Sequence, residues 1–305
     1  FFVKKVIIIF LQSSSDMEIP FHQIDVFTNY MFGGNPLAVF ANGDRFKQDE
    51  LQKVALEMNL SETTFVYPPS SNKAHFDVRI FTPKREIPFA GHPTLGTAYV
   101  LRTYCGVTAN PIRLNFKKGI ISVWVEGNKF FMEHPPSVVL NELSRSDKIA
   151  EALGLTFEEL DEKLPIRVVS TGFPALLVPV NSLSIINKVS INTQVLNEVL
   201  QPLGIDMIYP FCRKTMDPDN TVHVRAFAPN LGISEDPATG SVAGAMGAYW
   251  ASIDPENKSK MVIEQGYAMH RPSLIYVELS KTQKILVGGQ CHPVFTGNMM
   301  LKREL

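Results

Sequence analysis

The chain contains Arg79-Ile-Phe-Thr-Pro83 and, shortly after it, His92-Pro93-Thr94-Leu95-Gly96-Thr97. Both stretches recur in the same order as Arg225-Ala-Phe-Ala-Pro229 and Asp236-Pro237-Ala238-Thr239-Gly240-Ser241. The two linking segments differ in length by only two residues. Two ordered matches of this kind indicate an internal duplication, so we expect two similar halves.

Each copy predicts a strand followed by a helix. Residues 79–82 and 222–228 alternate apolar and polar side chains and end near proline, which is typical of strands. Asp236 is a favourable N-cap, and proline is favoured at the first helical position. We therefore expect helices over residues 93–102 and 237–250. Glycines in the second helix indicate that strands approach it closely.

The remaining pattern is mixed and mostly β, without the strict alternation of a doubly wound sheet. It predicts an α+β fold with two pseudo-symmetric halves, each a sheet or barrel wrapped around a central helix. The predicted first half is 17–128 with a C-terminal strand at about 295–305, and the second half is 129–294. Residues 1–16 are interpreted as an extension or artefact, because their apolar run is short for a signal peptide.

Composition narrows the class of protein. The 305 residues include 45% apolar and 19% charged residues, which is the profile of a globular chain. Lys and Arg total 29 against 30 for Asp and Glu, so no basic excess points to a nucleic-acid or membrane partner. Three scattered cysteines suit a reducing compartment, and we expect a cytoplasmic protein.

Standard phosphate-loop, dinucleotide, hydrolase and zinc-protease motifs are missing from the sequence, and we expect no metal site. Two glycine-rich helix starts remain, and helix N-termini favour anions. Facing each other across a cleft, they would bind a small carboxylate. The alternative interpretation is that His92 and Asp236 only cap the two helices and have no part in binding.

Glu62 lies between an amphipathic helix and an apolar strand. Desolvation at such a place raises the pKa of a carboxyl group toward the range useful for proton transfer. A surface or helix-end glutamate is the alternative interpretation, and the residues alone leave both open.

Several stretches together resemble the phenazine-biosynthesis PhzF-like family, whose fold is similar to that of diaminopimelate epimerase. They are residues 21–27 with 34–36, residues 59–65, residues 81–83 through 88–94, residues 235–241, and residues 265–266 with 271–273. The resemblance runs from residue 17 nearly to the C-terminus.

The resemblance implies a cofactor-independent isomerase, and in the family's phenazine enzyme the substrate is trans-2,3-dihydro-3-hydroxyanthranilate. By position, Glu62 would be the acid/base, and His92 and Asp236 would orient substrate or share the proton relay. The substrate carboxylate would be held by Ser241 and by the backbones of Gly91 and Gly240. The resemblance also implies a homodimer.

Two other functions stay open. One is a small-molecule or protein-binding module that retains the pocket without turnover. The other is an amino-acid racemase, which is disfavoured because neither helix start carries the cysteine that the epimerase relatives use. His270, where the family would have a small residue, is interpreted as a surface residue.

Overall fold

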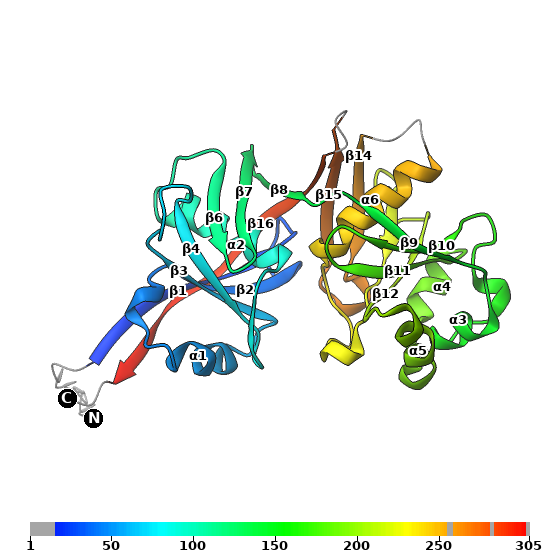
Figure 1. Ribbon diagram of the computed structural model, residues 1–305, viewed down its shortest axis with the longest axis horizontal. Helices are drawn as coiled ribbons and strands as arrows, with labels where there is room; N and C mark the ends of the chain where they lie inside the picture. The colour runs from blue at the N-terminus through cyan, green and yellow to red at the C-terminus, as the bar shows by residue number, and fades with distance from the viewer. Residues whose placement is uncertain (1–15, 255–258, 281–283, 303–305) are drawn as a thin grey trace, which may run out of the picture.

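The computed structural model describes residues 16–254, 259–280 and 284–302. Figure 1 shows two lobes, each with strands around one long helix. These helices are α2 (Gly91–Tyr104) in the first lobe and α6 (Gly240–Ile253) in the second. The α+β class and the arrangement of sheet around a central helix are confirmed. Residues 1–15 of the predicted extension lie outside the described residues, and Asp16 opens the first strand.

The first lobe is a closed barrel. Its neighbouring strands, in order, are β1 (Asp16–Val26), β2 (Asn35–Phe40), β3 (Glu62–Tyr67), β4 (Phe76–Phe81), β6 (Ile112–Phe116), β7 (Gly119–Glu126), β8 (Lys129–His134) and β16 (Ile285–Lys302). Antiparallel pairing of β16 with β1 closes the ring, and the short β5 (Glu86–Ile87) adds to β4. Helix α2 packs against β1, β2, β3, β8 and β16.

The second lobe continues the same sheet from β16. Its strands, in order, are β15 (Ser273–Leu279), β14 (Lys260–Gln265), β13 (Val222–Val224), β12 (Ile208–Cys212), β11 (Pro174–Pro179), β10 (Ile166–Ser170) and β9 (Val138–Leu143). Helix α6 packs against β10, β11, β15 and β16. Strands β8 and β16 border both lobes, so the division of the chain at residue 129 stays a prediction.

Strand directions repeat between the lobes, in agreement with the inferred duplication. In the first lobe β2–β3 and β4–β6 are parallel, and in the second β11–β12 and β13–β14 are parallel. Parallel neighbours need a crossover connection, which helices usually supply. Here the crossovers contain α1 (Glu50–Met58) and α2 in the first lobe, and α4 (Leu183–Lys188), α5 (Thr193–Leu200) and α6 in the second. Helix α3 (Asp147–Ala152) packs beside α5.

The repeated arginine has the same structural role in each lobe. Arg79 forms a two-pronged ion pair with Glu86, with both N–O distances 2.8 Å. Arg225 pairs with Glu235 in the same way at 2.8 and 2.7 Å. The guanidinium fork fits a carboxylate in this geometry, and each pair ties a strand to the segment that leads to the central helix.

Glycine lets strands approach both central helices. A Cβ at Gly96 in α2 would lie 2.6 Å from Leu37 Cδ2, and one at Gly247 in α6 would lie 2.5 Å from Val277 Cγ1. Real Cβ atoms essentially never lie so close to another atom, so a larger residue at either site would have to displace buried side chains of the strands. This explains why helices with several glycines form the centres of the lobes despite the propensity cost.

The predicted helix starts are wrong by two or three residues. Helix α2 begins at Gly91, earlier than expected, and α6 begins at Gly240, after the predicted Pro237. Asp236 is therefore not the N-cap, a position that Thr239 occupies. For α6 the reason is tertiary: Gln265 hydrogen bonds the backbone and side chain of Thr239 and holds the preceding loop out of the helix. Within the described ranges, no helix has the length and apolar character needed to span a membrane.

Candidate active site

Glu62 and His92 meet at the start of two elements of the first lobe. Glu62 is the first residue of β3, and His92 is the second residue of α2. Glu62 Oε2 lies 3.1 Å from His92 Nε2, and the two side chains are 14% and 8% exposed. The approach falls outside hydrogen-bond geometry, so both atoms are buried without a hydrogen-bond partner among the described residues.

The surroundings of Glu62 favour its protonated form. Burial, reinforced by the negative charge of Asp236, raises the pKa of Glu62 to about 8, while the Ser61 hydroxyl acts in the opposite direction. A carboxyl group poised near neutral pH is suited to both taking up and returning a proton.

His92 is neutral in this site. Burial lowers its pKa to about 3, and a hydrogen bond to the backbone of Pro36 only partly offsets that effect. The contact with Glu62 is therefore a neutral imidazole against a largely protonated carboxyl group at neutral pH, and not a salt bridge.

Asp236 approaches from the second lobe and is rich in hydrogen-bond donors. Its Oδ1 accepts from Asn35 Nδ2 at 2.9 Å, and its Oδ2 accepts from the Thr239 hydroxyl at 2.6 Å. Burial raises the pKa of Asp236 to about 6, and these donors limit the rise. At neutral pH Asp236 is therefore mostly ionised while Glu62 is mostly protonated.

The fully buried Gln265 fixes the loop that carries Asp236. Its Nε2 donates to the Asp236 carbonyl at 2.7 Å and to Thr239 Oγ1 at 2.8 Å. Its Oε1 accepts from Thr239 N at 3.0 Å and from the Tyr209 hydroxyl at 3.2 Å. Sequence analysis gave no role to Gln265 or Asn35, although both fall in stretches that carry the family resemblance.

The two helix starts abut at Gly91, Gly240 and Ser241. A Cβ at Gly91 would lie 3.3 Å from Ser241 N and 3.4 Å from the Gly240 carbonyl carbon. Neither N-cap side chain, that of Ala90 or that of Thr239, accepts a hydrogen bond from a backbone N–H of its helix in the described structure. The N–H groups of Gly91 and His92 in α2 and of Gly240 and Ser241 in α6 thus receive no acceptor from an N-cap side chain, and the helix dipoles favour an anion there.

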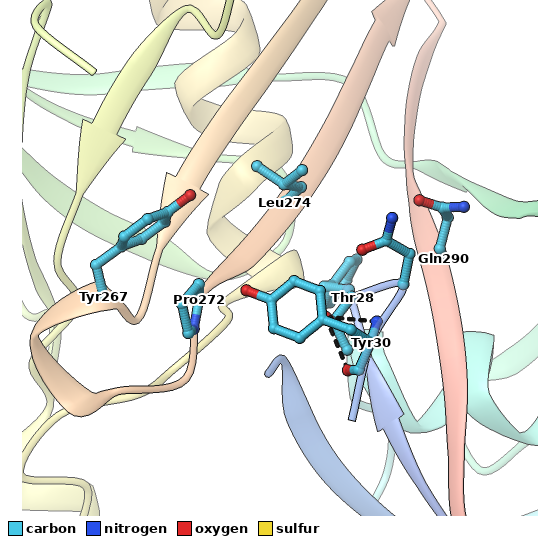
Figure 2. Close-up of a pocket in the computed structure, with 8 residues that line it drawn as sticks. Thr28, Tyr30, Tyr267, Pro272, Leu274 and Gln290 are labelled. Carbon is cyan, nitrogen blue, oxygen red and sulfur yellow. Dashed lines mark hydrogen bonds between the residues drawn. The ribbon is translucent and has the colours of Figure 1, made fainter. Parts of the chain in front are cut away.

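A separate small cavity lies at the junction of the lobes. It measures about 60 Å³, and Figure 2 shows Tyr30, Tyr267 and Pro272 around it. None of the six predicted site residues lines this cavity. Phe27 connects the two places, because it lines the cavity and its ring would lie 2.8 Å from a Cβ at Gly240.

His270 is exposed, with a left-handed backbone conformation at φ 56°. The next residue, Arg271, does reach across to the first lobe. Its guanidinium Nη2 donates to Asp25 Oδ1 at 2.6 Å. Among the described residues no group of three or more His, Cys, Asp or Glu side chains is arranged to hold a metal ion.

Comparison with known proteins places this geometry in a family. The model of the phenazine biosynthesis-like proteins, PhzC-PhzF, matches residues 24–297. An uncharacterized isomerase of Clostridium acetobutylicum is 31% identical, covering 92% of this chain and 97% of the relative. The trans-2,3-dihydro-3-hydroxyanthranilate isomerase of Pseudomonas chlororaphis is 31% identical, covering 83% and 87%.

Solved structures agree with the family assignment. The PhzF-family phenazine biosynthesis protein of Bacillus anthracis superposes with a TM-score of 0.85 at 29% identity, covering 93% of this chain and all of that one. A hydroxyproline epimerase of Agrobacterium vitis, at 12% identity and a TM-score of 0.61, shares the fold. The chain therefore belongs to the phenazine biosynthesis-like protein family and is an enzyme of the isomerase class.

Proposed function

We propose that this isomerase moves a proton within a small, cyclic carboxylate without a cofactor, and that the substrate resembles trans-2,3-dihydro-3-hydroxyanthranilate. The observation that carries the proposal is the buried Glu62, 3.1 Å from a neutral His92 and beside Asp236 of the other lobe. The relatives named for that substrate in two Pseudomonas species support the choice of compound.

In the proposed reaction, the minor fraction of Glu62 that is ionised near neutral pH takes a proton from a substrate carbon and returns it to another position of the same conjugated system. Its raised pKa brings the free energies of the two protonation states close together near neutral pH, so neither transfer is strongly uphill. His92 and Asp236 orient the substrate or share the relay. In this proposal every proton is carried by a side chain of the protein itself.

The substrate carboxylate would bind where the two central helices begin. Ser241 would supply a hydroxyl, and the backbones of Gly91 and Gly240 would supply N–H donors. The proposal is supported by the proximity of the two helix starts, since a Cβ at Gly91 would lie 3.3 Å from Ser241 N. A carboxylate held there from both lobes would place its ring over the interface that contains Glu62 and Asp236.

The test is solvent deuterium incorporation into trans-2,3-dihydro-3-hydroxyanthranilate, followed by NMR. We expect incorporation with the native protein and its loss with Glu62→Gln. Glu57→Gln, an exposed change on the neighbouring helix α1, is the matched control and should retain full exchange. Full exchange in Glu62→Gln would remove Glu62 from the mechanism. Binding without exchange in the native protein would instead favour a non-catalytic binding module.

We also propose that the protein is a homodimer and that it is located in the cytoplasm. Cys105, Cys212 and Cys291 are all free thiols, which suits a reducing compartment. Light scattering coupled to size exclusion would give the mass in solution, and a monomer would refute the dimer.

A further inference from the structure

Two side chains connect the carboxyl groups of Glu62 and Asp236 across the lobes. The Ser61 hydroxyl, next to Glu62 in sequence, donates to Asn35 Oδ1 at 3.0 Å. Asn35 Nδ2 then donates to Asp236 Oδ1 at 2.9 Å and to the Ala238 carbonyl at 3.1 Å. Asn35 is 1% exposed, so water does not compete for these groups.

The environment fixes the direction of every bond in this connection. Two acceptors, Asp236 Oδ1 and the Ala238 carbonyl, face one end of the Asn35 amide, so that end must be the NH₂ group. The amide oxygen therefore faces Ser61 and takes its only hydroxyl proton. The Ser61 hydroxyl also lies beside the Glu62 carboxyl group, where a hydrogen bond from it lowers the pKa of Glu62, but its single proton cannot serve Glu62 while it is donated to Asn35.

Asp236 and Glu62, at the two ends of this connection, differ in how many hydrogen-bond donors contact them. Asp236 accepts from Asn35, from the Thr239 hydroxyl and from the backbone of Ala238. Glu62 Oε2 has no hydrogen-bond donor among the described residues and faces the neutral ring of His92. A carboxylate is stable where donors converge, whereas a protonated carboxyl group is favoured where burial is not offset by donors.

We propose that Ser61 and Asn35 are positioning residues that join Glu62 and Asp236 into a pair with one proton, which resides on Glu62 while Asp236 stays ionised. When Glu62 loses this proton, the Ser61 hydroxyl can rotate and donate to the new carboxylate. The connection thus sets the resting state of the acid/base residue. Its catalytic meaning rests on the proposed function, but the proton distribution does not.

Other titratable groups near the pair do not reverse this distribution. His92 from α2 is neutral. Glu235, the residue before Asp236, is paired with Arg225 at 2.7 Å, so its charge is largely compensated. Tyr209 is fully buried and its pKa is raised far above the physiological range, so it stays protonated.

The experiment is a ¹³C NMR titration of labelled Asp and Glu carboxyl groups in the substrate-free protein. Glu62→Gln and Asp236→Asn assign the two signals. In the native protein we expect Asp236 to ionise at lower pH than Glu62. Asn35→Leu removes a donor from Asp236 and should raise its midpoint by about one pH unit, from the strength of a hydrogen bond to a charged group.

The matched control is Asn115→Leu, which removes an Asn–Asp hydrogen bond of the same length, 2.9 Å to Asp77, on the first barrel. It should leave both site midpoints unchanged. If Asn35→Leu does not fold, the nearly isosteric Asn35→Asp tests the same link, because it puts an acceptor opposite Asp236 and should also raise that midpoint.

An Asp236 midpoint that stays within the control's range in the Asn35 variant would overturn the proposal. So would a native Glu62 that ionises below Asp236. The titration needs no turnover, so a shifted midpoint with no deuterium exchange would refute the proposed function while leaving the pair intact.

Discussion

Replacing Glu62 by glutamine should abolish exchange and yet stabilise the fold. Glu62 ionises near pH 4.5 when unfolded but stays protonated to about pH 8 when folded. A raised folded pKa gives a contribution that is fully present below pH 4.5 and is lost as pH rises toward 8. At 1.36 kcal/mol per pH unit, the free energy of unfolding of the native protein is therefore about 3 kcal/mol lower at pH 7 than below pH 4.5. Glutamine does not titrate and is free of this cost.

Urea unfolding of both proteins, at pH 5 and pH 7, measures the difference. We expect Glu62→Gln to exceed the native free energy of unfolding by less than about 1 kcal/mol at pH 5 and by about 3 kcal/mol at pH 7. Glu57→Gln, at an exposed site, should match the native protein at both values. A Glu62→Gln protein no more stable than the native one at pH 7 would refute the view that burial holds Glu62 protonated. A difference independent of pH would do the same.

Three further substitutions test the supports of the site. Gly240→Ala puts a Cβ 2.8 Å from Phe27 Cζ, so thermal unfolding should show a loss of about 1–3 kcal/mol; an unchanged melting temperature would contradict this contact. Gln265→Leu leaves several buried polar groups unpaired, and we expect a loss of at least about 2 kcal/mol together with weakened carboxylate binding by calorimetry. Arg225→Lys cannot reproduce the two-pronged pair with Glu235, and chemical denaturation should show a loss of about 2 kcal/mol; native stability would show that the fork geometry is unimportant.

Much of the fold could be predicted because each copy of the duplicated pattern lies within a short stretch of sequence. A strand, a proline and a glycine-rich helix start follow each other within a few residues, twice. The exact helix starts could not be predicted, because Gln265, not the local preference of Asp236 for N-caps, determines where α6 begins. Local propensity is a weak prior when a buried side chain captures the backbone.

The site was predictable only in part. The sequence and the family resemblance indicated Glu62, His92 and Asp236, and the structure brings these three close together. Their roles and those of Gly91, Gly240 and Ser241 stay predictions. No role for Asn35 could be predicted from the sequence, because its contact with Asp236 joins residues 201 positions apart and no spacing rule predicts such a contact.

Strand β16 makes closure of the first lobe depend on residues far along the chain from the other strands of that lobe. Residues 291–302 of β16 close the first barrel against β1, and residues 285–290 pair with β8. During synthesis on the ribosome the first lobe therefore waits as an open sheet, with the edges of β1 and β8 unpaired, until β16 has emerged. Exposed edges of this kind invite association with other chains. Newly made protein is most vulnerable in that interval, and loss of residues 291–302 would leave the edge of β1 permanently unpaired.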